Sequence, residues 1–299
     1  MHDDHDHDHG LAHDLAVMER MMARRRALKW FAGAGTVALV AGCGGSDAST
    51  GTTSSSSATA TPTPTPSTTA TPTPTATGTT TACIADPTET AGPYPADGTN
   101  SASGSTSNVL TASGVVRSDI RASFIGATTV ATGVQVTLTL TLVDVNATCA
   151  PLAGYAIYLW HCDRQGLYSL YTASAQSYLR GVQVTDANGQ VTFTTIFPGC
   201  YDGRWPHIHF EVYSSLSNAT SGRYATLVSQ LALPSSVCST VYVDTATYPS
   251  SSSNFARIAL SSDGVFADNT AAQIAQQTPT MTGSPSAGYQ AAAVIGLAR

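Results

Sequence analysis

The run at residues 134–145, VQVTLTLTLVDV, alternates apolar and polar residues more strictly than any other part of the chain. Because successive side chains of a β-strand point to opposite faces, this period of two predicts a strand with one buried face. No helix of convincing length is predicted between residues 83 and 267. Together with further alternating runs, this pattern predicts an all-β fold, an antiparallel β-sandwich.

Two later blocks extend the β pattern. Residues 155–162 read as a strand that runs into a glycine-containing turn just before Tyr168. Residues 180–196 hold two alternating runs joined by the turn sequence at 186–189, DANG, which predicts a β-hairpin. A strand, a hairpin and a further strand in this order could bring Tyr168 and Tyr201 close to the pair His207 and His209.

The segment that holds Tyr201 and both histidines, residues 198–213, reads PGCYDGRWPHIHFEVY. In a strand, His207 and His209 lie on one face while Ile208 and Phe210 lie on the other. Five of the eight histidines precede residue 14, so few remain for the rest of the chain. Two imidazoles at this spacing beside Tyr201 predict a metal site. The alternative is an ordinary strand with two half-exposed histidines.

Composition restricts the partners. Only 11% of the residues are charged, Lys29 is the one lysine, and the formal net charge is -6. Since no basic patch is present to neutralise phosphates, nucleic acid is not predicted as a partner.

The N-terminal part predicts export. Residues 24–29 carry three arginines and Lys29, and an apolar run follows at 30–41 that is too short for an ordinary membrane span. The run ends in VAGC at 40–43, which resembles a bacterial lipobox. By that resemblance residues 1–43 are a signal segment and Cys43 becomes lipidated, so that the protein is an exported, membrane-anchored lipoprotein. The true start and the role of the early His-Asp run stay open.

Three further segments follow. Residues 44–82 are rich in Ser, Thr and Pro and predict a disordered linker. Residues 83–267 are long enough for a single β-sandwich domain. Residues 268–299 are rich in Ala, Gln and Thr, and we expect a low-complexity tail that is partly ordered at best.

Cysteine usage adds a second expectation. With Cys43 lipidated, five cysteines remain, and outside the cytoplasm they would tend to pair. Two disulfides and one free thiol are therefore expected, with the connectivity open. Because Cys162 and Cys200 lie near the proposed ligands in sequence, thiolate ligation is a rival to the histidine site.

Three motifs then fall in a fixed order: LAGYAIYLWHCDRQGLYS at 152–169, RGVQVTDANGQVTFTTIFPGCY at 180–201, and GRWPHIHF at 203–210. In this order they resemble the intradiol ring-cleaving dioxygenases, the group of catechol and protocatechuate dioxygenases, and most of all their secreted, single-chain bacterial members. The resemblance covers residues 86–266. It also implies that residues 88–95, TETAGPYP, lie over the mouth of an active site.

The resemblance implies a set of site residues. Tyr168, Tyr201, His207 and His209 would hold Fe(III), with Tyr168 staying bound and Tyr201 displaced by substrate. The donor chemistry agrees, because two phenolates demand a hard, highly charged cation that can keep tyrosine deprotonated. Arg204 would lie beside the substrate ring as a fixed positive charge.

Gln230, in SQLALP, is a weaker match to a glutamine near the same pocket. The implied reaction cleaves a catechol-type ring with O₂ to a muconate-type diacid. The segment between Tyr201 and His207 is short, which implies an open pocket, and no basic residue can be assigned to a substrate carboxylate.

Two other classes of function compete with this reading. The first is a surface β-sandwich that binds a partner without catalysis. The second is a zinc or copper hydrolase built on His207 and His209, for which Asp202 and Glu211 are the nearby candidate bases. The identity of the catechol and the oligomeric state are open.

Overall fold

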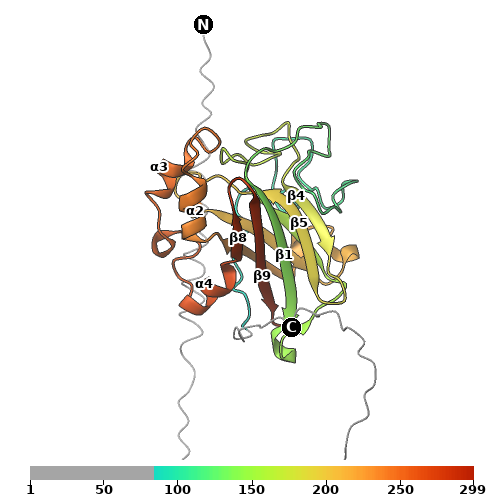
Figure 1. Cartoon of the computed structure of the whole chain (residues 1–299). Helices are drawn as coiled ribbons and strands as arrows, with labels where there is room; N and C mark the ends of the chain where they lie inside the picture. The colour runs from blue at the N-terminus through green and yellow to red at the C-terminus, as the bar shows by residue number, and fades with distance from the viewer. Residues whose placement is uncertain (1–83) are drawn as a thin grey trace, which may run out of the picture. The chain divides into compact units, whose positions relative to one another are not determined.

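Two β-sheets face each other across an apolar core in the computed structural model, which describes residues 84–299. The first sheet has the order β2-β1-β9-β8, with β5 paired to β1, and the second has the order β4-β3-β6-β7 (Figure 1). The first sheet contains β1 (Gln135–Asp144), β2 (Ala150–Pro151), β5 (Gln190–Ile196), β8 (Thr280–Ser284) and β9 (Gly288–Leu297). The second contains β3 (Ala156–Trp160), β4 (Arg180–Val184), β6 (His207–Tyr213) and β7 (Leu227–Ala232). The prediction of an all-β sandwich is confirmed.

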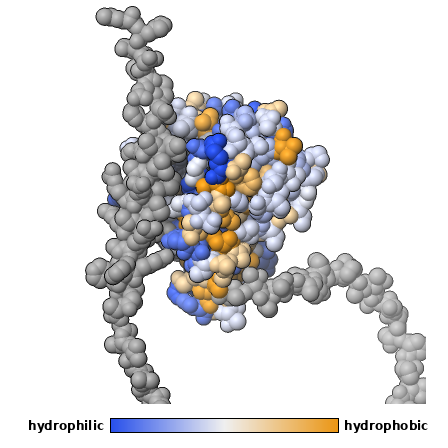
Figure 2. Space-filling model, turned by 90° about the vertical axis from the view of Figure 1, so that its left-hand side faces the viewer, coloured by the Kyte–Doolittle hydropathy of each residue, from blue (hydrophilic) through white to orange (hydrophobic). Residues whose placement is uncertain are grey.

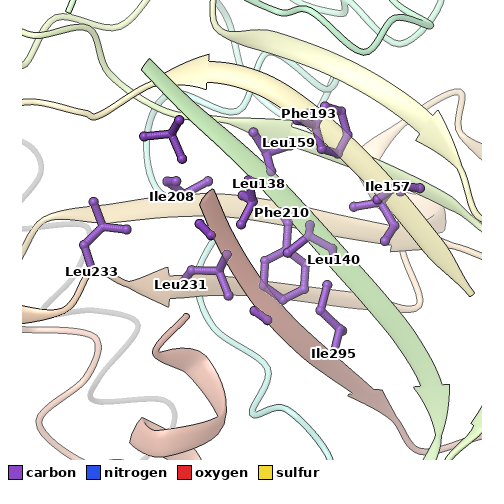
Figure 3. Packing of buried hydrophobic residues seen from close by; sticks show 14 of the residues in the cluster. Leu138, Leu140, Ile157, Leu159, Phe193, Ile208, Phe210, Leu231, Leu233 and Ile295 are labelled. Carbon is purple, nitrogen blue, oxygen red and sulfur yellow. The ribbon is translucent and has the colours of Figure 1, made fainter. Parts of the chain in front are cut away.

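The core lies between the two sheets and is built from alternate residues of facing strands. Leu138 and Leu140 of β1 meet Ile208 and Phe210 of β6, all at most 2% exposed (Figure 3). Burying a side chain of this size stabilises the fold by about 1.5–3 kcal/mol relative to leaving it exposed. Because Ile208 and Phe210 fill this core, the other face of β6 is left for His207 and His209.

The end of the chain corrects one prediction. The segment expected as a low-complexity tail forms helix α4 (Ala271–Gln277), followed by β8 and β9. Strand β9 lies in the interior of the first sheet, parallel to β1 and antiparallel to β8. Within the two described sheets, β9 and β1 form the one parallel pair of strands, whereas the other pairs are antiparallel as predicted. The domain therefore extends to the end of the sequence and not to residue 267.

The predicted hairpin at 180–196 is also wrong. Its turn forms, since the Asp186 N–H donates to the carbonyl of Gln190 and the Gly189 N–H to that of Asp186. The two strands then separate, because β4 pairs with β3 in one sheet while β5 pairs with β1 in the other. The turn thus connects the two layers of the sandwich.

Short helices lie beside the β8 edge of the first sheet, namely α2 (Ser235–Val241), α3 (Ser251–Phe255) and α4 (Figure 1). Figure 2 shows this side, where apolar and hydrophilic residues are interspersed on the visible surface. Four 3₁₀ turns complete the regular structure: Val145–Ala147, Leu216–Asn218, Gly222–Tyr224 and Leu260–Ser262. Within residues 84–299, no helix is long and apolar enough to cross a membrane.

The cysteines differ from expectation. Cys149 is disulfide-bonded, whereas Cys162, Cys200 and Cys238 are free and buried. The expectation of two disulfides is therefore wrong. The signal segment, the lipidated Cys43 and the linker at 44–82 all lie outside the described residues and stay predictions.

Candidate metal centre

Strand β6 presents both histidines of the candidate site. His207 and His209 are 2% and 3% exposed, and their Nε2 atoms are 3.1 Å apart. His207 Nδ1 lies 2.6 Å from the carbonyl oxygen of Trp205. Because a carbonyl can only accept, Nδ1 carries the proton and Nε2 presents its lone pair to the site. His209 is held differently, by parallel stacking on Trp160 at 4.8 Å.

Two loops bring the tyrosines to this strand, and Asp163 ties the loops together. Its side chain accepts the N–H of Gln165 and of Leu167, which forms the turn before Tyr168. Its carbonyl accepts the Gly199 N–H, which anchors the loop that leads to Tyr201. The predicted proximity of both phenols to the histidine pair is confirmed.

Four side-chain atoms converge on one point. Tyr168 Oη lies 3.3 Å from His207 Nε2 and 3.2 Å from His209 Nε2. Tyr201 Oη lies 3.1 Å from His207 Nε2. The single lone pair of His207 Nε2 thus has three polar neighbours within hydrogen-bonding distance, which it cannot all serve.

A metal ion at the centre of these atoms would use every one of them. Protein nitrogen and oxygen ligands lie about 2.0–2.2 Å from such an ion. Ligands at that distance and at angles between a right angle and a tetrahedral angle are about 3 Å apart, which matches the separations above. The donor set of two phenol oxygens and two imidazole nitrogens therefore fits a metal ion.

Burial sets the protonation states of these ligands. It lowers the pKa of His207 to about 3, helped by the positive charge of Arg204, and it lowers the pKa of His209 well below its usual range. Both imidazoles are therefore neutral and able to bind a metal. Burial raises the pKa of Tyr168 and of Tyr201 above the usual tyrosine value, with Arg204 opposing the rise. A cation must therefore be bound before these phenols ionise near neutral pH.

Arg204 and Gln230 form a second group beside the ligands. Gln230 lies on β7 directly across from His209, and its Oε1 accepts from Arg204 Nη2 at 2.8 Å. Arg204 Nε donates to Asp263 Oδ2 at 2.9 Å, with both side chains buried. The structure thus brings the predicted Arg204 and Gln230 to the site. It also places Asp263 there, which could not be predicted from the sequence.

The N-terminal strap, defined as residues 88–95, covers the same face. Gly92 has a φ of +72°, and a Cβ there would lie 3.3 Å from His209 Cε1. The ring of Tyr94 lies 4.8 Å from that of Tyr168. Gln230 Nε2 donates to the carbonyl of Thr90, and buried Arg180 donates to that of Tyr94. The expectation that this segment lies over the site agrees with these contacts.

Other candidate residues lie away from the convergent atoms. His161 bonds Thr195 Oγ1 and the Cys162 carbonyl. Burial raises the pKa of Cys162 well above its usual value and that of Cys200 to about 12. Their sulfur atoms lie against backbone carbonyls, that of Cys162 at 3.4 Å from Gly199 O and that of Cys200 at 3.6 Å from Arg204 O, and not against the convergent side-chain atoms, so thiolate ligation is not supported. Asp202 pairs with Arg257 at the surface.

The alternative of a zinc or copper hydrolase is not supported by its second candidate base, Glu211, or by the metal ligands that such an enzyme needs. Glu211 is fully buried and accepts from Tyr213. No group of three or more His, Cys, Asp or Glu side chains able to hold a metal occurs within residues 84–299. Zinc sites in hydrolases usually take three protein ligands from those residue types.

Comparison with known proteins gives the following matches. Residues 123–232 match the profile of a family described as Dioxygenase. No curated protein sequence is significantly similar to the chain. A crystal structure of a dioxygenase shares 24% identity over 72% of this chain and 95% of its own, with a TM-score of 0.52. The chain shares the fold of that dioxygenase.

Two further solved structures are similar. An intradiol ring-cleavage dioxygenase from Tetranychus urticae is 27% identical over 62% of this chain and 87% of its own, with a TM-score of 0.49. A catechol 1,2-dioxygenase from Acinetobacter sp. ADP1 is 19% identical over 56% of this chain and 53% of its own, with a TM-score of 0.35.

Proposed function

We propose that this chain is an intradiol-type dioxygenase that cleaves a catechol-type ring with O₂ to a muconate-type diacid. The observation that carries the proposal is the convergence of Tyr168, Tyr201, His207 and His209. The Oη atoms of the tyrosines and the Nε2 atoms of the histidines form four neighbouring pairs with separations of 3.1–3.3 Å. The match to a dioxygenase family over residues 123–232 supports the same reaction class.

Fe(III) is the ion that we assign to these ligands. Two phenols must lose their protons to bind, and burial makes that loss harder here. A hard trication compensates for this cost better than Zn²⁺, which favours Cys, His and carboxylate. When bound, Fe(III) supplies Lewis acidity that activates a catechol bound as a dianion for reaction with O₂.

The two tyrosines differ in burial, which supports different roles for them. Tyr168 is 1% exposed and packs in the apolar cluster with Trp160 and Cys162, so it is held in place. Tyr201 is only partly buried. Tyr201 is therefore the ligand that could swing away, and its Oη, as the phenolate it would be while bound, could accept one of the two protons that a catechol loses, the other leaving to solvent.

Arg204 supplies fixed positive charge to the reacting ring. Its guanidinium is bonded to Gln230, which lies directly across from His209, and its charge lowers the pKa of both histidines and opposes the rise in pKa at both tyrosines. Charge that develops on the ring carbon as it attacks O₂ would be stabilised by this preorganised cation. The half-buried strap and the packed rings of Tyr94 and Tyr168 cover one side of the site.

The test uses the full chain, loaded with iron and then mixed with catechol without oxygen. We expect about one iron per chain by the site's stoichiometry, a visible phenolate-to-Fe(III) band that shifts with catechol, and a muconate-type product once O₂ is admitted. His209→Ala should lose the iron and the band. Iron and activity retained in that variant would refute the ligand assignment, and zinc, copper or no metal after iron loading would refute the reaction.

A further inference from the structure

Asp263 is the carboxylate most fully enclosed by donors near the candidate site. It is 0% exposed and lies in the segment after the 3₁₀ turn Leu260–Ser262. Its Oδ1 accepts the N–H groups of Val265 and Phe266, and its Oδ2 accepts the N–H of Trp205. Three backbone donors thus fix this carboxylate independently of any other side chain.

The same Oδ2 receives Arg204 Nε at 2.9 Å, so the guanidinium is held from one side by Asp263. Gln230 holds it from a second side through Nη2. Arg204 Nη1 has no hydrogen-bond partner among the described residues and is not one of their fully buried, unpartnered atoms, so this corner of the otherwise buried guanidinium is left free to meet a ligand. An arginine side chain has many rotamers, and two fixed partners reduce these to one orientation.

We propose that Asp263 is a positioning residue of the site, which acts through Arg204: it aims the Nη1 edge of the guanidinium at the reacting ring and balances its charge. The inference rests on the proposed function. Without Asp263, Arg204 would be a buried cation without a balancing carboxylate, free to turn toward other acceptors. The segment after Leu260–Ser262 thereby becomes part of the site although it contributes no metal ligand.

The test compares Asp263→Asn with Asp119→Asn, which breaks the exposed pair of Asp119 with Arg121 and serves as the matched control. Iron content, the visible band, kcat and KM for catechol are measured for the full chain. We expect Asp263→Asn to keep its iron and to lose about 100-fold in kcat, the usual cost of one preorganised electrostatic group, with a smaller change in KM. The control should match the wild type.

A double-mutant cycle with Arg204→Gln shows whether Asp263 acts through that arginine. In the Arg204→Gln background, Asp263→Asn should change kcat less than about threefold, since the group it positions is already gone. If the fold-losses in kcat of the two single variants multiply in the double variant, the proposal is overturned. A wild-type kcat in Asp263→Asn would also overturn it, as would a loss of activity fully explained by loss of iron. If Asp263→Asn does not fold, Asp263→Glu keeps the charge but moves the carboxylate, and an unchanged kcat there would overturn it.

A measurement without turnover separates this inference from the proposed reaction. Loading with diamagnetic Ga(III) allows the Arg204 Nε–H resonance to be observed in ¹⁵N-labelled protein and assigned through its loss in Arg204→Gln. A slowly exchanging resonance in the wild type and in Asp119→Asn that is lost in Asp263→Asn supports the positioning role, even if the chain cleaves no catechol. The same resonance unchanged in Asp263→Asn would overturn it.

Discussion

Replacing Gly92 with alanine is expected to damage the candidate site through two separate terms. The first is conformational, because a φ of +72° is in the left-handed region, where a Cβ costs about 1–2 kcal/mol. In a domain of about 150–250 residues, each kcal/mol lowers the melting temperature by about 2–4 °C, so this term alone predicts a drop of about 2–8 °C.

The second term is a contact with the proposed ligand. The new Cβ would lie 3.3 Å from His209 Cε1, which is tighter than most real contacts. His209 cannot yield easily, because its ring is stacked on Trp160 at an angle of 6°. We therefore expect the strap or the imidazole to shift, and the affinity for iron to fall by about tenfold, at the lower end of what disturbed ligand support costs.

Gly126→Ala is the matched control for this experiment. Gly126 has a φ of +70°, but a Cβ there would meet no atom within 4 Å. Thermal unfolding of both variants and of the wild type isolates the conformational term, and iron titration isolates the contact. If Gly92→Ala bound iron as tightly as Gly126→Ala, the strap would not press on His209 and the reasoning would be wrong.

Three further outcomes are expected. Tyr201→Phe should keep iron but weaken and shift the visible band and lower kcat about 100-fold, the effect of losing one proton acceptor; an unchanged band would contradict its ligation. Burial raises the pKa of Asp86 from 3.8 to about 7, because the folded protein favours the protonated carboxyl. The free energy of unfolding that this preference adds is complete below pH 3.8 and is lost as the pH rises to about 7. Asp86→Asn should therefore gain stability over the wild type across that window, by about 1.4 kcal/mol for each unit of the shift, and a constant difference in melting temperature from pH 4 to 8 would argue against it. Deleting β9 should abolish cooperative unfolding followed by circular dichroism, because Ile295 and Leu297 leave the core and β1 loses a neighbour; a sharp transition in the truncated chain would contradict this role.

The ligand positions could be predicted because their geometry is local. The spacing of His207 and His209 fixes them on one face once the segment is a strand, and the apolar Ile208 and Phe210 fix which face is buried in the core. Tyr168 and Tyr201 follow from the order of motifs around that strand. The structure adds their convergence to within 3.3 Å.

Asp263 could not be predicted, because its role depends on a tertiary approach. It lies 59 residues from Arg204 in sequence, in a stretch that reads as an ordinary turn. The roles of Asp163 and Arg180 could not be predicted for the same reason. The Asp163 carbonyl accepts the N–H of Gly199, and Arg180 donates to the carbonyl of Tyr94, and both of these partners are distant in sequence.

Strand β9 could not be predicted from the sequence for a different reason. Its buried positions include Ala291 and Ala293, and alanine gives a weak hydrophobic signal, so the alternation seen in the structure is hard to recognise in QAAAVIGL. The parallel pairing with β1 adds no signal of its own, because the two strands are separated by most of the domain. The turn at 186–189 can be predicted from its sequence, but that sequence does not specify whether the strands on either side pair with each other.

The place of β9 has a consequence for synthesis. The strand lies between β1 and β8, yet most of the described domain separates it in sequence from β1, so the ribosome makes it long after β1. The first sheet can therefore be completed only after residues 288–297 have been synthesised, and until then β1 exposes an unpaired edge of alternating Val, Leu and Thr. A nascent chain of this kind depends on protection until β9 has emerged from the ribosome, which makes chaperone demand, and not only stability, sensitive to changes in β9.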